Sequence, residues 1–314
     1  MPPYVPNGLQ PAVSPHNNWP MNKLLCFGLG YSASELASRL APQGWQITAT
    51  ATSTESAARA AALGYQSIVF DGASRPPQLE RAIDAATHAI VSAPPGPMGD
   101  PILSQFATMI VASPNLRWIG YLSTIGVYGD HGGAWIDETT PVLPRSERSQ
   151  RRAIAESAWL DVGRTSAKTV LVFRLAGIYG PGRSALDSLL DGKARRLIKP
   201  GQVFNRIHRD DIAGLLEAAI ARSPGHSIYN VCDDEPAPPQ DVIAYAAHLL
   251  GLPVPPDVAY DRAPLSAMAA SFYSENKRIS NARAKCDLGW HPSYPTYREG
   301  LAAIATMMRG HSPV

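Results

Sequence analysis

Apolar residues along the chain form short continuous runs, separated by stretches in which they recur with helical spacing. Helical spacing is found over 33–40, and alanine-rich helical stretches lie near 54–63, 77–87, 101–112 and 147–163. Strand-like runs lie at 23–27, 46–50, 67–70, 88–92, 118–122 and 169–173. This alternation predicts an α/β fold, a doubly wound parallel sheet with helices on both faces.

The pattern changes after Tyr179, where prolines break the chain into short segments, with a helix expected over 212–221 and one more strand at 227–231. We therefore predict a sheet domain over 21–179, to which 204–232 returns, and a smaller C-terminal substrate-binding lobe over 180–203 and 233–314. The proline-rich residues 1–20 show neither periodicity nor a signal-peptide pattern, which predicts a disordered extension.

The junction between the first strand and the first helix carries the pattern Gly-x-Gly-x-x-Ala. Glycine at position 28 permits a tight turn, glycine at position 30 lets the backbone approach a phosphate, and alanine at position 33 allows close packing of helix on strand. The free N–H groups of the helix would then face an anion. This context predicts a Rossmann-type dinucleotide site formed by Gly28, Leu29, Gly30, Tyr31, Ser32 and Ala33.

Composition narrows the class of protein. The chain has 314 residues, of which 45% are hydrophobic and 17% charged, and no apolar run approaches the roughly 20 residues of a membrane span. A dispersed net charge of +2 argues against nucleic acid as a partner. Cys26, Cys232 and Cys286 lack the spacing of metal ligands, so we expect no metal site, reduced thiols and a cytoplasmic location.

The carboxyl ends of parallel strands meet at one edge of a sheet, which is where ligands bind in doubly wound folds. In this chain Gly28, Thr50, Asp71, Ser92 and Ser123 all fall at such ends. Five strand ends are therefore expected to converge on one groove.

Three further motifs follow in order: Leu122-Ser-Thr-Ile-Gly-Val-Tyr-Gly129, Arg174-Leu-Ala-Gly-Ile-Tyr-Gly-Pro-Gly182 and Asn205-Arg-Ile-His-Arg-Asp-Asp-Ile-Ala213. With them, and with the closing Leu288-Gly-Trp-His-Pro292, the chain resembles the extended short-chain dehydrogenases/reductases over about residues 22–309. More narrowly, it is similar to the atypical members of the NAD-dependent epimerase/dehydratase group.

The resemblance implies positions around a bound cofactor. Ser123 and Thr124 would lie at the nicotinamide, where Thr124 would hydrogen-bond a substrate carbonyl or hydroxyl; the alternative is that both side chains only satisfy backbone groups at the strand end. Asp71 would lie by the adenine. The residues implied beside the ribose are Ser92, Ala93 and Pro94, and those beside the nicotinamide amide are Leu175, Ala176, Gly177 and Ile178.

The chain departs from the family at its proton-transfer pair. Relatives carry Tyr-x-x-x-Lys on the helix after the Ser/Thr strand, where this chain has Arg148 and Arg152. Arginine stays charged and cannot transfer the proton, although Arg152 could hold the ribose or a phosphate. Tyr128, with a pKa lowered by a nearby arginine, is the candidate acid/base; the alternatives are a packed structural Tyr128, and a mobile His131 in the glycine-rich loop that follows.

The turn after the second strand carries hydroxyls, at Thr50, Thr52 and Ser53, in place of the carboxylate that binds the ribose of NAD. This favours NADP(H) over NAD(H). Only Arg39 or Arg59 is near enough in the sequence to bind the additional phosphate.

Basic residues in the C-terminal half suggest an anionic or sugar-like small molecule as substrate. Arg183 and Arg206 are the candidates for binding it, whereas Arg209, Asp210 and Asp211 form a helix-capping ion-pair set, with Asp211 as the cap.

Together these features predict an NADP(H)-dependent oxidoreductase or epimerase that transfers a hydride at a carbonyl or hydroxyl carbon. The alternative is a non-catalytic NADP(H)-binding sensor or partner-binding protein, because the Tyr/Lys pair is missing. A homodimer through the helices near 101–112 and 147–163 is also possible from the resemblance.

Overall fold

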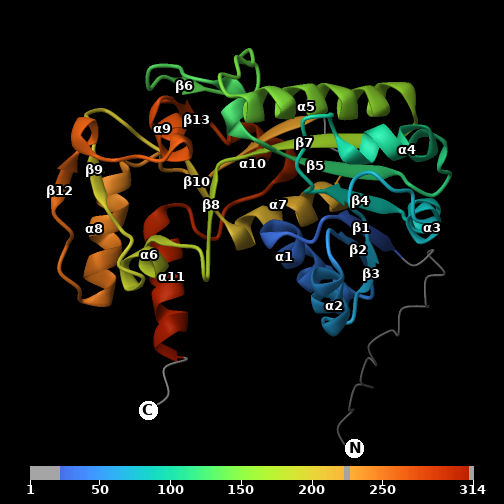
Figure 1. Cartoon of the computed structure of the whole chain (residues 1–314), viewed down its shortest axis with the longest axis horizontal. Helices are drawn as coiled ribbons and strands as arrows, with labels where there is room; N and C mark the ends of the chain where they lie inside the picture. The colour runs from blue at the N-terminus through green and yellow to red at the C-terminus, as the bar shows by residue number, and fades with distance from the viewer. Residues whose placement is uncertain (1–21, 223–226, 311–314) are drawn as a thin grey trace, which may run out of the picture.

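Seven parallel strands form the central sheet of the computed structural model, which describes residues 22–222 and 227–310 (Figure 1). Their order across the sheet is β11-β7-β5-β4-β1-β2-β3. The bounds are β1 Lys23–Phe27, β2 Gln46–Ala51, β3 Gln66–Val69, β4 His88–Val91, β5 Trp118–Thr124, β7 Thr169–Leu175 and β11 Ile228–Val231. The predicted doubly wound parallel sheet is confirmed, whereas the extension predicted over 1–20 lies outside the described residues.

Successive side chains of each strand point to opposite faces of the sheet, and both faces are covered. Leu24 and Cys26 of β1 pack with α1 and α7 in one buried cluster. Leu25 and Phe27 pack with α3, α4 and α5 in a second cluster on the other face. The runs are continuously apolar because neither face meets water.

The helices of these two layers lie close to the predicted ranges. Those packed with Leu24 and Cys26 are α1 Tyr31–Leu40 and α7 Arg209–Ala221, while α2 Thr54–Ala62 lies beside β2 and β3. Those on the opposite face are α3 Pro77–Ala85, α4 Pro101–Ala112 and α5 Glu147–Thr165. Pro77 and Pro101 both stand at the first helical position, where the missing N–H costs no hydrogen bond.

The start of α7 corrects one prediction. The helix begins at Arg209, and its cap is His208, whose Nδ1 accepts from the Asp210 N–H at 3.2 Å. Asp211 is already inside the helix, and its carboxylate instead accepts from the backbone N–H groups of Ser293 and Tyr294 at 2.6 and 3.1 Å. The sequence interpretation missed this because the partners of Asp211 lie 82 and 83 residues further along the chain.

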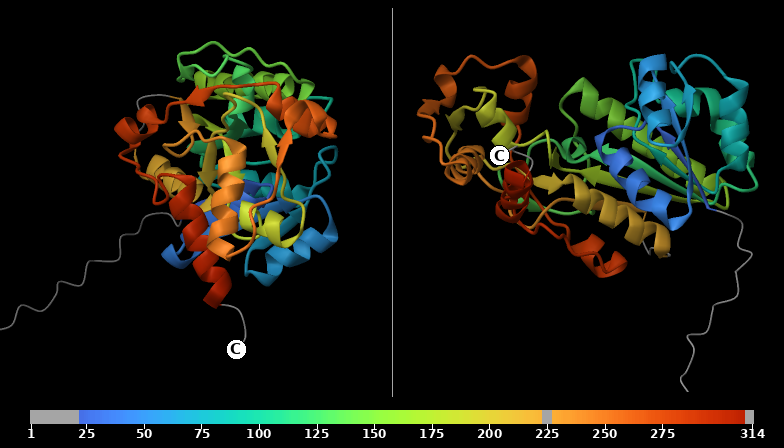
Figure 2. Two further views of the ribbon diagram at one scale, coloured as in Figure 1. Left: turned by 90° about the vertical axis from the view of Figure 1, so that its left-hand side faces the viewer. Right: turned by 90° about the horizontal axis from the view of Figure 1, so that it is seen from below.

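The smaller lobe lies at one end of the sheet (Figures 1 and 2). Its core is a third buried cluster between three helices, α6 Ala185–Leu190, α8 Pro239–Leu250 and α11 Tyr297–Gly310. Three short parallel pairs lie outside the central sheet: β9 Arg196–Ile198 with β12 Asp257–Ala259 within this lobe, β6 Trp135–Ile136 with β13 Arg278–Ile279, and β8 Gly177–Tyr179 with β10 Arg206–His208. The remaining helices are α9 Ala267–Tyr273 and α10 Ala282–Leu288. None of these short strands was predicted, because two or three residues show no periodicity.

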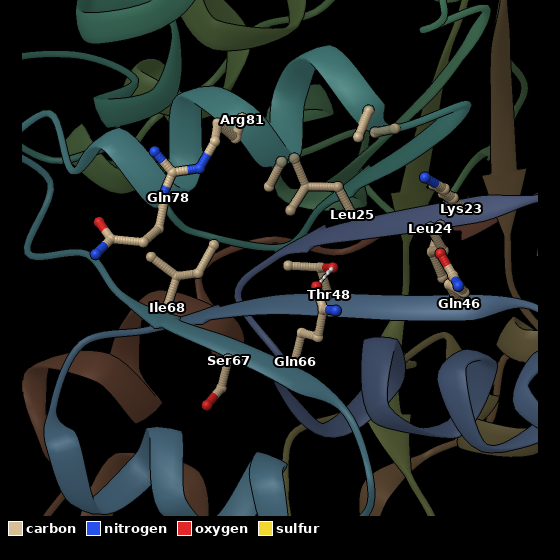
Figure 3. Close-up of a pocket in the computed structure, with 13 residues that line it drawn as sticks. Lys23, Leu24, Leu25, Gln46, Thr48, Gln66, Ser67, Ile68, Gln78 and Arg81 are labelled. Atoms are coloured by element: carbon tan, nitrogen blue, oxygen red, sulfur yellow. Dashed lines mark hydrogen bonds between the residues drawn. The ribbon is translucent and has the colours of Figure 1, made fainter.

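A groove of about 430 Å³ opens over the sheet where α3 leaves β2 and β3 uncovered (Figure 3). Gln78 and Arg81 of α3 line one side of it, and Thr48 and Gln66 of the strands line another. It also contacts Lys23, at the amino end of β1, and so lies away from the carboxyl ends of the strands.

Within the described ranges, no helix is both long and apolar enough to cross a membrane. No cluster of histidine, cysteine or acidic side chains suited to a metal ion occurs there either.

Candidate cofactor and substrate site

The glycine loop has the shape that a dinucleotide pyrophosphate requires. Gly28 has a φ of +87°, and a Cβ built there would lie 2.9 Å from Ser92 Oγ, so any side chain would meet both strain and a clash. The Gly28 N–H donates to Thr50 Oγ1 at 2.9 Å, and Ser92 Oγ donates to the Gly28 carbonyl at 2.7 Å. Thr50 and Ser92 therefore fix the loop from the ends of β2 and β4, the two strands that flank β1.

The N-terminus of α1 follows this loop directly. Gly30 is the N-cap residue, and no side chain caps the helix. The N–H groups of the first turn therefore remain available to an anion, and the helix dipole adds to their attraction. Ser32 and Ala33 are buried against the sheet, which agrees with the close packing expected of a small residue at position 33. The residues present thus fit a dinucleotide.

The turn after β2 lacks a carboxylate at the strand end itself. Thr52 is exposed, and Ser53 Oγ caps α2 by accepting from the Ser56 N–H at 3.2 Å. The arginines considered for an additional phosphate already have partners: Arg59 pairs with Glu55 at 2.6 Å, and Arg39 pairs with Glu35 at 3.1 Å. Each guanidinium therefore already has a carboxylate partner within the protein.

Asp71, expected near the adenine, follows β3 and stabilises its own turn. Its Oδ1 accepts from the N–H groups of Ala73 and Ser74, both at 2.9 Å. These hydrogen bonds hold its pKa at about 2, so the carboxylate is ionised at any physiological pH.

The end of β5 carries Ser123 and Thr124, which have different environments. Thr124 Oγ1 accepts from the Gly126 N–H at 3.1 Å, so its own hydroxyl proton remains free to donate. Ser123 is buried, and its Oγ donates to Glu156 Oε1 at 2.5 Å. Thr124 thus satisfies a backbone group, as the alternative interpretation expected, whereas Ser123 binds a side chain. Only Thr124 keeps a donor for a ligand.

Behind Ser123 lies a buried ion pair that the sequence interpretation did not recognise as a functional element. Arg174 Nη2 is 2.8 Å from Glu156 Oε2, and Arg174 Nε donates to both oxygens of Glu156 at 3.2 Å. Both side chains are about 5% exposed. The sequence signal is that charged residues stand among the buried positions of both elements: Arg174 in β7, and Arg152 and Glu156 in α5.

Tyr128 belongs to the same buried group, and one expectation about it is wrong. Its ring is fully buried, and its hydroxyl donates to Asn230 Oδ1 at 2.8 Å. The Arg174 guanidinium lies 4.7 Å from the ring centre, yet burial raises the pKa of Tyr128 rather than lowering it. A phenol that is closed off from solvent, with a raised pKa, is unsuited to accepting a proton from a substrate.

The two arginines at the positions of the family's Tyr and Lys also differ. Arg148 is exposed on α5. Arg152 is buried, and its Nη1 donates to the Leu122 carbonyl at 2.6 Å and to the Tyr121 hydroxyl at 3.3 Å. Its other guanidinium nitrogens make no hydrogen bond to the described residues, so donors remain near the end of β5.

The glycine-rich loop with His131 is not the mobile segment that we expected. The backbone N–H groups of His131 and Gly133 both donate to the Asn276 carbonyl at 3.0 Å, and Asp130 Oδ1 accepts from the Asn276 N–H at 2.7 Å. Lys277 Nζ donates to the Gly129 carbonyl at 2.5 Å. The partners lie about 145 residues away in the sequence, which is why the loop alone suggested mobility.

Arg183 and Arg206, the candidates for substrate binding, line one cavity of about 550 Å³ in the smaller lobe. Arg183 belongs to the turn Gly180–Arg183, and its guanidinium lies 5.7 Å from the ring of Tyr31, the first residue of α1 after the glycine loop. The structure thus brings the two arginines together and places one of them beside the expected cofactor site.

Comparison with known proteins bears on the fold of the chain. No protein-family model matches the chain. Protein YeeZ of Escherichia coli (strain K12) is 29% identical over 289 residues, which are 88% of this chain and 97% of that protein. The 3-diazoavenalumate denitrifying reductase of a Streptomyces species is 28% identical over 229 residues, which are 70% of this chain and 64% of that protein.

Two solved structures bear on the fold. A functionally unknown conserved protein from Silicibacter pomeroyi is 48% identical with a TM-score of 0.83, covering 92% of this chain and 99% of that one. The dTDP-glucose 4,6-dehydratase of Bacillus anthracis, solved in complex with NAD, is 18% identical with a TM-score of 0.73, covering 93% and 97%. The structural neighbours are NAD-dependent epimerases and dehydratases, which confirms the resemblance at the level of the fold.

Proposed function

We propose that this chain, which has the oxidoreductase fold of the NAD-dependent epimerases and dehydratases, binds a nicotinamide dinucleotide and acts on a small anionic substrate. The reaction proposed is hydride transfer at a carbonyl or hydroxyl carbon beside Thr124. The observation that carries the proposal is the glycine loop, braced by Thr50 and Ser92 and followed by an uncapped helix N-terminus.

When bound, the nicotinamide would supply or accept the hydride. Thr124 would hold the substrate oxygen, because the Gly126 N–H occupies an acceptor site of its hydroxyl and leaves the proton to donate. Arg152 would hold the ribose with the guanidinium nitrogens that make no internal hydrogen bond.

One observation favours a second candidate, a non-catalytic nicotinamide-binding sensor. Tyr128 is buried with a raised pKa, and Arg148 stands where relatives have their tyrosine. Neither can exchange a proton with a substrate at neutral pH. A replacement of Thr124 by valine separates the two candidates: an enzyme loses turnover while keeping its cofactor affinity, and a sensor has no turnover to lose.

NADP(H) is the proposed cofactor, with NAD(H) as the competitor. The hydroxyl-bearing turn of Thr52 and Ser53 supports a 2′-phosphate, because no carboxylate at the strand end would repel it. Against it stand the NAD found in the related dehydratase complex and the ion pair that occupies Arg59. The cytoplasm and a homodimer stay expectations from the sequence.

The test is a titration of the full chain with NADPH and, separately, NADH, followed by energy transfer from tryptophan to the nicotinamide. Gly28→Ala should abolish binding, because the new Cβ meets Ser92 Oγ at 2.9 Å. Gly64→Ala is the matched control, since Gly64 has a similar φ of +83° but an added Cβ there contacts nothing within 4 Å. If the unmodified protein bound neither cofactor, the proposed function would be abandoned.

A further inference from the structure

The cavity that holds Arg183 and Arg206 lies between α6, α8, α11 and the turn Gly180–Arg183. Its volume of about 550 Å³ is within the range of small-molecule sites, roughly 300–1,000 Å³. The chemistry of its walls identifies what it would hold.

Three cations of this cavity have no carboxylate partner among the described residues: Arg183, Arg195 and Arg206. The acidic groups that line it are already engaged. Asp187 accepts from the Ser184 N–H at 2.8 Å and from the Ser184 hydroxyl at 2.6 Å in a capping box, and Asp191 pairs with Lys193 at 2.8 Å. The cavity therefore has uncompensated positive charge.

Arg206 is the least exposed of the three. Its Nη1 donates to the Phe204 and Ala237 carbonyls at 2.9 and 3.1 Å, and its other guanidinium nitrogens have no hydrogen-bond partner among the described residues. Burial lowers its pKa, which expresses the cost of holding this charge away from water. A guanidinium whose N–H groups are not all used within the protein can bind an anion.

Asp233, the nearest candidate to neutralise Arg206, does not do so. It is 2% exposed, forms no ion pair with Arg206, and its Oδ2 has no hydrogen-bond partner. Burial raises the pKa of Asp233 to about 8 against the opposing effect of Arg206, so the carboxyl is mostly protonated at neutral pH. The positive charge of Arg206 is therefore left for a ligand.

Most of the uncharged lining is apolar or aromatic, and this determines the kind of body that a ligand could have. It includes Tyr179, Pro239, Val242, Ile243, Tyr297 and Leu301, together with the hydroxyl-bearing Ser184 and Ser188. A planar carboxylate matches a single guanidinium with two parallel hydrogen bonds, and these walls would bury an apolar or aromatic body attached to it. A nucleoside diphosphate would need several donors around its phosphates. Of the three unpaired guanidiniums, those of Arg183 and Arg195 are exposed, and only that of Arg206 is partly buried in the cavity.

The cavity is also joined to the glycine loop. Gly180 to Arg183 forms a tight turn with Pro181 and Gly182 at its centre, and Gly182 has a φ of +72°. Tyr31 donates its hydroxyl hydrogen bond to the Pro181 carbonyl at 2.8 Å, and a Cβ on Gly180 would lie 2.5 Å from that hydroxyl. A side chain at Gly180 would therefore crowd this contact, and the turn, whose Gly182 and Arg183 line the cavity, connects the cavity with the cofactor loop.

We propose that this cavity binds a small molecule with an apolar or aromatic body and one carboxylate, which Arg206 holds. The inference rests on the proposed function, because it takes this cavity, joined to the cofactor loop by the hydrogen bond from Tyr31 to the Pro181 carbonyl, as the place that binds the substrate. It replaces the broader expectation of an anionic or sugar-like molecule by a carboxylic acid.

The test is calorimetric titration of the full chain, without any dinucleotide, with 3-phenylpropionate as the probe. We expect it to bind, with its neutral amide weaker by about tenfold or more, because only the carboxylate pairs with a guanidinium. Arg206→Met should weaken the carboxylate by about tenfold to a hundredfold and leave the amide unchanged, and Arg206→Lys should keep part of the affinity. Arg164→Met, on an exposed arginine outside the cavity, is the control that should change nothing.

A second variant keeps the test decisive if Arg206→Met does not fold. Ile243→Trp fills the cavity without touching a charge, and it should abolish binding of acid and amide alike. Equal affinity for acid and amide, tighter binding of phenyl phosphate than of the acid, or no binding of any probe would each overturn the proposal. Since the assay contains no dinucleotide, its failure is distinguishable from failure of the cofactor titration.

Discussion

Two arginines in this molecule have opposite environments, although each has a carboxyl group nearby: Arg174 is buried, and Arg206 is partly buried. Arg174 makes three hydrogen bonds to Glu156, and that carboxylate also accepts from Ser123. Arg206 donates only to backbone carbonyls, and Asp233 keeps an oxygen without any partner. Arg174 and Glu156 bind each other, and we call them the closed pair. Arg206 does not pair with Asp233 and lines a cavity, and we call these two residues the open side.

The difference shows which charges serve the scaffold and which can serve a ligand. A buried ion pair with all its hydrogen bonds made is costly to break, because removing one partner leaves the other charge buried and alone. An unpaired buried cation already carries that cost in the folded protein, so its removal need not destabilise the fold. Stability measurements can therefore tell the two arginines apart without knowledge of the substrate.

The largest expected effect comes from breaking the closed pair. Glu156→Gln keeps the size of the side chain but leaves Arg174 without a counter-charge, and we expect a loss of about 3–5 kcal/mol in the free energy of unfolding. Arg206→Met is the comparison and should cost no more than about 1 kcal/mol, because the Phe204 and Ala237 carbonyls keep their backbone partners. Urea unfolding measures both; equal costs would contradict the distinction.

The next largest effect is a dependence of the free energy of unfolding on pH, which Asp233 on the open side should cause. The folded protein raises the pKa of Asp233 from the usual value near 3.8 to about 8, so in this window the folded state binds more protons than the unfolded state. The contribution of Asp233 to the free energy of unfolding is fully present below its pKa in the unfolded state. It is lost as the pH rises towards its pKa in the folded state. One group changes the free energy by about 1.4 kcal/mol per pH unit, which gives about 3 kcal/mol between about pH 5.5 and 7.5.

Asp233→Asn should therefore remove this decline, and the difference between variant and parent in unfolding free energy at several pH values measures it. Asp130 is the control, with a pH dependence of stability of the opposite sign, because the Asn276 N–H lowers the pKa of its carboxyl. Stability from Asp130 is present above its unfolded pKa and is lost as the pH falls. An unchanged decline in the Asp233 variant would mean that this carboxyl is ionised in the folded protein.

What could be predicted from the sequence follows the same division between local and distant causes. The sheet and the glycine loop were predictable, because strand runs, helical spacing and Gly28-x-Gly30 act within a few residues of each other. The environment of Tyr128 was not, because its partner Asn230 is 102 residues away. The fixed His131 loop and the position of Asp211 were missed for the same reason.

The candidate site shows the same division between features with local causes and features with distant ones. The roles of Thr50 and Ser92 at strand ends follow from the topology of a parallel sheet, in which those ends must meet. The absence of an ion pair between Arg206 and Asp233 depends on the fold around the cavity, where strands of two or three residues have no sequence signal. Sequence reasoning could name Arg206, but it could not tell whether a carboxylate neutralises it.

The smallest expected effect concerns Tyr128, on the closed side of the comparison. Tyr128→Phe removes one buried hydrogen bond, to Asn230, and should cost about 1–2 kcal/mol in the free energy of unfolding. It should leave cofactor affinity unchanged, because the hydroxyl is fully buried and does not reach the glycine loop's partners. Tyr31→Phe provides the contrast: its hydroxyl ties the Gly180–Arg183 turn to that loop, so dinucleotide and carboxylate affinities should both fall by a few-fold. If Tyr128→Phe instead shifted the pH profile of turnover on an identified substrate, Tyr128 would be the acid/base after all, and the buried network would have to open during the reaction.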